Sequence, residues 1–289
     1  MDLPPNTMGR LGKAKTSRSR THSKTGQRKL QAGERKESSV VNKQGWFTSL
    51  FDELNDYWAE IADARSTEKE VEFIENVVKA KGLVLDLCCG TGRHSILLRN
   101  KGWNIIGLDI SPNLLRIAKE KMTEKHVHFP LVRGEMRHLP FRSETFASII
   151  NMFTSFGYLP SEKEDMKSLK EIVRTLKQDG LFLMDIVNRE YLLQVFQEKD
   201  WGEFTHFYMM ERRTLDAKGL KLHSQWLILD KNTGKSRTFD HNLRLYSFPQ
   251  LQKMLKKAGL AKEKVYRGYE EQDFQQGSPR LIVLARKAS

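Results

Sequence analysis

The alternation of short apolar runs with helical segments between residues 83 and 187 restricts the fold of this chain more than any other feature. Such runs are typical of buried parallel strands, and apolar residues three and four positions apart mark the helices between them. The pattern predicts strands at 83–87, 104–109, 127–132, 146–151 and 181–187, and helices at 95–99, 112–122 and 161–177. Because strands separated by helices form right-handed βαβ units, we expect a parallel sheet covered on both faces.

Two further helices are expected before this pattern, within residues 46–80. From Trp46 to Ile61 apolar residues recur at helical spacing. Thr67 and Glu70 then have the spacing of a capping box at the start of a second helix.

Antiparallel strands are expected after the pattern. Residues 204–213, 220–230 and 236–246 alternate polar and apolar, which predicts an antiparallel β cap inserted at 191–246. A helix at 248–258 and strands at 263–269 and 280–286 are expected to return to the main sheet as its final antiparallel edge. The predicted fold class is therefore α/β, with a doubly wound, Rossmann-like, mostly parallel seven-stranded sheet and an antiparallel β cap insertion.

Positive charge is concentrated in residues 1–45. The formal net charge is +13, and this segment holds eleven Lys and Arg residues against three acidic ones, which gives +8 for the segment and +5 for residues 46–289. It lacks aromatic residues, so we expect a disordered basic tail that acts as a solubilising extension or reflects a true start at Met8. A tail of this charge also offers a site for nucleic acid or an acidic partner.

Several classes of protein are disfavoured by composition. No window approaches the roughly 18 apolar residues of a membrane span, and no secretory signal precedes residue 45. The two cysteines, Cys88 and Cys89, are adjacent and cannot form a disulfide framework or a four-ligand metal site. We expect a reduced, cytoplasmic protein with no membrane partner and no metal, and the sequence carries no signal for its oligomeric state.

The turn after the first strand carries the most chemical information. Gly90 and Gly92 allow a ligand to approach the backbone, but Ser95 stands where a dinucleotide motif has its third glycine. Asp86, four residues before Gly90, would repel a phosphate and attract an ammonium group. Asp109 ends the second strand 19 residues after Gly90, where a carboxylate accepts hydrogen bonds from a ribose.

An ammonium group and a ribose without a phosphate describe S-adenosylmethionine, and residues 46–287 resemble the class I S-adenosylmethionine-dependent methyltransferases. The resemblance implies that Asp86 faces the methionine end of the cofactor and that Asp109 holds the ribose. It implies a cofactor site formed by Asp86, Cys88, Gly90, Gly92, Asp109, Ile110, Glu135, Met136 and Asn151. In that site Glu135 and Met136 read the adenine, Asn151 lies beside the sulfonium, and Cys88 replaces a glycine that many relatives carry.

Motifs that the sequence lacks disfavour some classes of methyl acceptor. Asn151-Met152-Phe153-Thr154 has neither proline of the Asn/Asp-Pro-Pro-aromatic motif, and no cysteine outside the cofactor loop could attack a pyrimidine. Residues 151–159 resemble the corresponding segment of small single-domain bacterial and archaeal enzymes such as the sugar-amine N-methyltransferases. This resemblance implies methyl transfer to nitrogen or oxygen of a small molecule. Two other hypotheses stay open: an RNA or protein methyltransferase that uses the basic tail, and a cofactor-binding module without catalysis.

Three residues are candidates for contact with the acceptor or its proton: Tyr158, Asp185 at the end of the fifth strand, and Tyr57 on the first helix. Packing explains Tyr57 equally well, and capping of the following turn explains Asp185. His94 is expected to have a structural role. His241 and Arg244 in the cap are weaker candidates.

Overall fold

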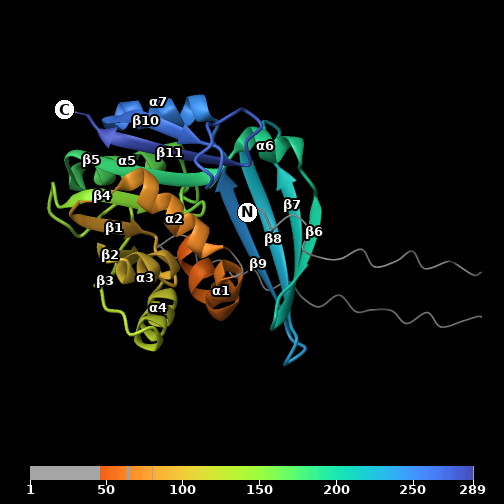
Figure 1. Ribbon diagram of the computed structural model, residues 1–289. Helices are drawn as coiled ribbons and strands as arrows, with labels where there is room; N and C mark the ends of the chain where they lie inside the picture. Colours follow the sequence, from red (N-terminus) through yellow and green to blue (C-terminus); the bar gives the residue numbers. More distant parts are fainter. Residues whose placement is uncertain (1–45, 64–65, 80, 289) are drawn as a thin grey trace, which may run out of the picture.

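The computed structural model describes residues 46–63, 66–79 and 81–288, so the predicted tail at 1–45 lies outside the described residues. Figure 1 shows two separate sheets. The seven-stranded sheet has the order β10-β11-β5-β4-β1-β2-β3, and the four-stranded sheet has the order β6-β7-β8-β9. The strands of the large sheet are β1 (Leu83–Leu87), β2 (Asn104–Asp109), β3 (Leu131–Arg133), β4 (Phe146–Asn151), β5 (Leu176–Val187), β10 (Leu260–Tyr266) and β11 (Arg280–Lys287).

The helices of the described residues fall on both sides of the large sheet and between the two sheets. They are α1 (Trp46–Asp63), α2 (Thr67–Val78), α3 (Arg93–Asn100), α4 (Pro112–Glu124), α5 (Glu162–Thr175), α6 (Arg189–Gln194) and α7 (Phe248–Ala258). The strands of the small sheet, here called the cap, are β6 (Lys199–Glu203), β7 (Phe207–Leu215), β8 (Lys221–Asp230) and β9 (Ser236–Arg244).

Alternating residues of the large sheet belong to two separate cores. Val84 of β1 packs in the core that α2 and α3 cover, whereas Leu85 and Leu87 pack in the core that α5 and α7 cover. These residues are buried on both faces of the sheet, which explains why β1 is a nearly continuous apolar run. The predicted mostly parallel seven-stranded sheet with a separate antiparallel sheet is confirmed.

The order of the strands reverses beside β1. Strand β1 pairs in parallel with β2 on one side and with β4 on the other. Crossover connections therefore leave β1 and β4 in opposite directions, and the carboxyl ends of these strands border a crevice.

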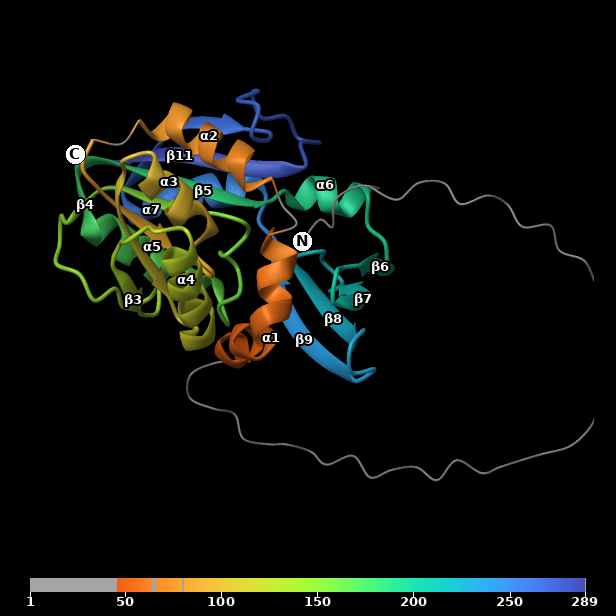
Figure 2. The same cartoon turned by 60° about the horizontal axis from the view of Figure 1, so that its bottom comes forward.

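Helix α1 joins the two sheets, as Figure 2 shows. Leu54 and Trp58 of α1 pack with Trp226 and Phe239 on the inner face of the cap, the face directed toward α1. The helix bends at Asn55, whose φ is 41°. Because α1 also contacts α4, it closes the space between the cap and the large sheet.

The last two strands form the expected antiparallel edge of the large sheet, because β11 pairs antiparallel with both β5 and β10. Three local predictions need correction. Strand β3 begins at Leu131, not at 127, and the cap has a fourth strand, β6, that the sequence pattern did not reveal. The capping box is also wrong: α2 starts after Ser66 without a side-chain cap, and Glu70 turns into the interior instead.

Candidate active site

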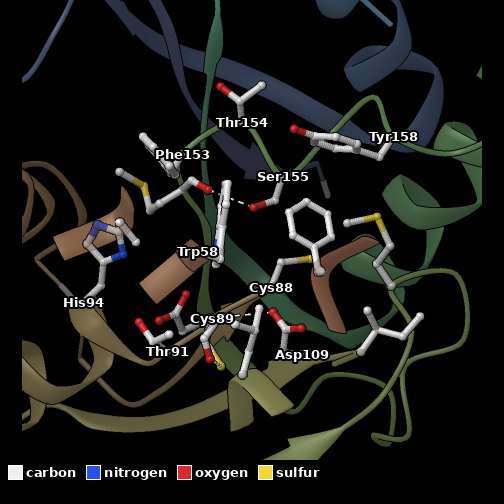
Figure 3. Close-up of a pocket in the computed structure, with 18 of the residues that line it drawn as sticks. Trp58, Cys88, Cys89, Thr91, His94, Asp109, Phe153, Thr154, Ser155 and Tyr158 are labelled. Carbon is white, nitrogen blue, oxygen red and sulfur yellow. Dashed lines mark hydrogen bonds between the residues drawn. The ribbon is translucent and has the colours of Figure 1, made fainter. Parts of the chain in front are cut away.

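A cavity of about 950 Å³, open solvent included, lies at the carboxyl ends of β1, β2 and β4. Figure 3 shows Asp109 and the cysteines on one side, with Trp58 reaching across the middle toward Phe153. Phe51 and Trp58 of α1 contribute aromatic rings 5.1 Å apart. The cavity thus combines carboxylates from strand ends with an aromatic cover.

The loop after β1 turns sharply through three residues with positive φ. Cys88, Gly90 and Gly92 have φ values of 63°, 54° and 72°. Glycine adopts these values without cost, whereas Cys88 is strained there. A Cβ added at Gly90 would come 3.8 Å from Nε1 of Trp58, so the backbone at Gly90 faces the cavity.

Asp86 is a buried carboxylate at the edge of the cavity. Its Oδ2 accepts a hydrogen bond of 2.6 Å from Oγ of Ser95. Burial raises the pKa of Asp86, while the nearby side chains of His94 and Arg93 act against this rise. Oγ1 of Thr91 also lines the cavity and has no hydrogen-bond partner among the described residues. Because buried polar atoms are nearly always paired, this unpaired hydroxyl fits a hydrogen bond to a bound ligand.

Asp109 is fixed by the backbone on both sides. Its Oδ2 accepts from the N–H of Gly90 at 2.9 Å and its Oδ1 from the N–H of Ser111 at 2.9 Å. Burial raises the pKa of Asp109, and the backbone donors oppose that rise. Since a carboxylate has about four lone-pair directions, these backbone bonds leave some capacity to accept from a ligand. Ile110 lines the cavity beside it.

Glu135 and Met136 line the cavity on the side of β3. The carboxylate of Glu135 accepts from Nε of Arg137 at 2.8 Å, and Arg137 also pairs with Glu164 at 2.6 Å. The Glu135 side chain is therefore held in place by a neighbouring ion-pair network.

A buried cluster that the sequence analysis missed lies behind the loop. Glu70 of α2 contacts Nη2 of Arg93 at 2.6 Å and Nε2 of His94 at 2.5 Å, and all three side chains are buried. Although burial favours the protonated acid, the hydrogen bond and charge of His94 together with Arg93 lower the pKa of Glu70 to about 2. The available signal was the helical spacing of Thr67, Glu70, Val71 and Ile74, which places Glu70 on the buried face.

The turn after β4 is strained and is held by Asp185. Phe153 and Thr154 have φ values of 59° and 57°, unusual for non-glycine residues and especially for a β-branched one. Oδ2 of Asp185 accepts from the N–H of Phe153 at 3.0 Å, and Oδ1 accepts from Arg280 at 2.8 Å. Asp185 is fully buried and is not among the residues that line the cavity.

The other predicted site residues divide into two groups. Cys88, Gly90 and Tyr158 line the cavity together with the residues above, whereas Gly92, Asn151 and Tyr57 do not. Gly92 precedes α3 as its N-cap, Asn151 donates to the carbonyl of Leu87 at 2.8 Å, and Tyr57 donates to Asp230 of the cap at 3.1 Å. The sequence analysis missed Phe51, Thr91 and Ser155 as lining residues.

Tyr158 and the cysteines are protonated groups at neutral pH. Burial, together with the charge of Glu211, raises the pKa of Tyr158 above its usual value. Burial also raises the pKa of Cys88 and Cys89 well above the usual value of a thiol. A thiolate nucleophile is therefore disfavoured here.

Comparison with known proteins finds methyltransferases among the similar sequences. A family model described as a methyltransferase domain matches residues 84–180. The inferred methyltransferase YqeM of Bacillus subtilis is 24% identical over 246 residues, which are 84% of this chain and 96% of that protein.

Solved structures show the same fold at lower identity. An S-adenosylmethionine-dependent methyltransferase from Clostridium acetobutylicum has a TM-score of 0.72 and 20% identity, covering 83% of this chain and 99% of that one. The sugar N-methyltransferase KedS8 from a Streptoalloteichus species has a TM-score of 0.65 and 16% identity, covering 91% of this chain and 100% of that one.

Proposed function

We propose that this chain, which is a class I S-adenosylmethionine-dependent methyltransferase, transfers the methyl group to a nitrogen or oxygen atom of a small molecule. The observation that carries the proposal is the cover of the cavity. Phe51 and Trp58 of α1 lie over it, and the cap packs behind them. A small molecule would lie in the cavity beneath these rings, whereas a macromolecule would have to insert a single group.

We assign the cofactor to the loop side of the cavity. In this assignment Asp86 and Thr91 contact its methionine end, Asp109 accepts from its ribose hydroxyls, and Glu135 and Met136 lie beside the adenine; all five residues line the cavity. Support comes from the unpaired Oγ1 of Thr91 and from the open approach to Gly90. Asn151 and Gly92 then act indirectly, by fixing the ends of β4 and α3.

The protein's contribution to the reaction is alignment and exclusion of water. When bound, S-adenosylmethionine would supply the methyl group: the acceptor lone pair would bond to the methyl carbon as the carbon–sulfur bond breaks, the electrons of that bond would stay on sulfur in S-adenosylhomocysteine, and the acceptor would release its proton to solvent. The strained turn at Phe153 and Thr154, tied down by Asp185, fixes the wall that faces the acceptor. Phe51 and Trp58 keep water away from the reacting atoms. The domain proposed to carry this chemistry spans residues 46–289, with the cap at 191–246 as its insertion.

The experiment that tests this proposal follows a radiolabelled methyl group from S-adenosylmethionine with the full chain. The acceptors are pooled small amines, phenols and hydroxy acids in one reaction, and tRNA and a protein extract in two others. We expect label only in the small-molecule fraction. Label in tRNA or protein would contradict the small-molecule acceptor, and an absence of label in all three with intact cofactor binding would favour a non-catalytic module.

The basic charge of residues 1–45 motivates the RNA alternative. The described part of the molecule offers little for it, because residues 46–289 carry only +5. If RNA were the acceptor, deletion of residues 1–45 should reduce salt-sensitive binding, and the log–log slope should fall with the number of lost phosphate contacts.

A further inference from the structure

A groove with lysines along both walls lies between α5 and α7. The two helices contact each other on the face of the large sheet opposite α2 and α3. The groove has a volume of about 1370 Å³, open solvent included, and none of the residues that line it lines the candidate active site. Its walls carry five lysines, which are Lys163, Lys167 and Lys170 of α5 and Lys253 and Lys257 of α7.

The positive charge of this groove is largely uncompensated. On each helix the lysines follow one another at the spacing that brings side chains together, and like charges at that spacing destabilise a helix. Lys167 pairs with Glu164 at 2.7 Å, but the other four lysines have no ion-pair partner among the described residues. One acidic residue, Glu162, lines the groove. An anionic occupant would therefore neutralise charge that the folded chain leaves unpaired.

The floor of the groove is apolar. Met166 of α5 and Met254 of α7 line it, and Met254 is only 5% exposed. Methionine side chains adapt to the shape of a partner, and the aliphatic stems of lysines extend such a surface. The described residues that line the groove include no arginine and no aromatic ring, the groups that bind phosphates bidentately and stack on bases. An apolar floor between lysine walls therefore favours a protein segment over a nucleic acid.

We propose that this groove binds an acidic amphipathic helix of a partner protein. Apolar side chains of that helix lie against Met166 and Met254, and its carboxylates point to the lysines on both walls. The lining residues span 162–170 of α5 and 250–257 of α7, so the site takes roughly two turns of the incoming helix, about 11–12 Å. Residues 1–45 have the wrong charge to be this occupant, because they hold eleven Lys and Arg residues against three acidic ones.

The docking groove begins close to the cavity in the chain without being part of it. Leu159 lines the cavity, and Glu162, three residues later, lines the groove. The partner helix is recognised by its own charge and apolar stripe, whichever molecule accepts the methyl group. The docking site goes beyond the proposed function and does not depend on it.

The test uses fluorescent synthetic peptides of one length with the full chain at about 0.15 M salt. The first is a Leu/Glu helix with its leucines on one face, the second has the same composition with the leucines scattered, and the third carries glutamine in place of every glutamate. A single-stranded oligouridylate is the nucleic-acid probe. Fluorescence anisotropy measures binding, and carbodiimide cross-linking with mass spectrometry identifies the lysines that contact glutamate. We expect the first peptide to bind at least tenfold more tightly than the other two and to cross-link to lysines of the groove.

Two double variants separate the groove from the basic segment at 1–45. Lys163→Glu with Lys253→Glu should weaken binding of the first peptide at least tenfold, because one attractive contact on each wall becomes repulsive. Lys69→Glu with Lys119→Glu changes the net charge equally at exposed positions of α2 and α4, and should alter binding less than twofold. Equal midpoints of thermal unfolding in both double variants and the wild type show that the fold is intact.

Four outcomes would overturn the inference. Equal binding of the peptide with scattered leucines would show attraction by charge alone, without the apolar floor. Equal binding by the two double variants, or cross-links confined to residues 1–45, would place the contact outside the groove. Loss of oligouridylate binding in the groove variant without loss of peptide binding would make the groove a nucleic-acid site. No binding of the first peptide up to about 1 mM would leave the lysines as solvated surface.

Discussion

At the scale of single residues, the proposed cofactor site predicts that binding depends most on Asp86. Asp86→Asn keeps the shape but removes the charge that the proposal directs at the methionine end of the ligand. We expect the affinity for S-adenosylmethionine to fall at least tenfold, about 1.4 kcal/mol, as for a lost charge-assisted hydrogen bond. Calorimetric titration checks this, with the exposed Glu120→Gln of α4 as control. Wild-type affinity in Asp86→Asn would refute the assignment.

Glu70 should matter for stability more than any exposed acidic residue. Glu70→Gln leaves Arg93 buried without its carboxylate, and breaking a buried ion pair in this way costs about 3 kcal/mol. Urea unfolding at pH 7 measures the change. Glu120→Gln breaks an exposed pair with Arg116 and should cost no more than about 0.5 kcal/mol. Similar losses in the two variants would mean that Glu70 is not a buried anion.

Burial of His241 predicts that the unfolding free energy falls in mild acid. Because burial holds its pKa near 3, against 6.5 for a free histidine, the unfolded chain binds a proton more readily. The contribution of the neutral His241 side chain to the unfolding free energy is fully present above pH 6.5 and is lost progressively as the pH falls toward 3. Between pH 7.5 and 5.5 this amounts to about 1.4 kcal/mol of unfolding free energy.

The comparison of two variants isolates this effect. His241→Phe should reduce the fall in unfolding free energy between these pH values by that amount, whereas His223→Gln, on the exposed side of β8, should leave it unchanged. Identical pH profiles of wild type and His241→Phe would show that His241 is not held neutral.

Individual site residues could be predicted where the strand end itself places the side chain. Asp86 lies inside the buried strand β1 and Asp109 ends β2, and both line the cavity. Asp185 also lies near the end of its strand, but its carboxylate binds the N–H of Phe153 and the side chains of Tyr269 and Arg280, and it is not among the lining residues. No sequence pattern marks the strained turn at Phe153 and Thr154 that Asp185 supports. Glu70 was misassigned because its partner His94 lies 24 residues away.

At the scale of elements, the segment after β4 is joined to the cap through Gly157. Its φ is 106°, and a Cβ there would come 2.5 Å from the carbonyl oxygen of Arg244. Gly157→Ala should therefore lower the free energy of unfolding by about 1 kcal/mol through the strain of positive φ, and by a further 1–3 kcal/mol, roughly, through the clash. Gly234→Ala shares the positive φ but meets nothing within 4 Å, so it should cost only the strain. Thermal unfolding of both variants measures the difference, and equal losses would exclude the close approach.

The sequence pattern predicted most elements because burial on both faces produces continuous apolar runs. The sequence pattern failed for strands whose paired segment is short or lies at the edge of a sheet. Val127 and Phe129 are buried and resemble a strand, but pairing with β2 starts only at Leu131, opposite Gly107. Strand β6 has one apolar side chain, Trp201, and that side chain is exposed at the edge of the cap.

At the scale of the whole molecule, α1 links the cap to the large sheet and covers the cavity. Tyr57 and Glu60 of α1 bind Asp230 and His206 of the cap, and Asp52 accepts from Ser111 at the start of α4. No helix among residues 46–63, 66–79 and 81–288 is long and apolar enough to cross a membrane. Which molecule enters beneath α1 could not be predicted from sequence, because the side chains of α1 and the cap follow no motif.

The measurement that tests the central claim most directly is calorimetric titration of the full chain with S-adenosylmethionine and S-adenosylhomocysteine, with NAD as the phosphate-bearing control. We expect one site of micromolar affinity for the first two ligands and none for NAD, because the carboxylate of Asp86, which lines the cavity, would repel a pyrophosphate. Binding of NAD, or failure of both sulfur ligands to bind, would contradict the cofactor site described here.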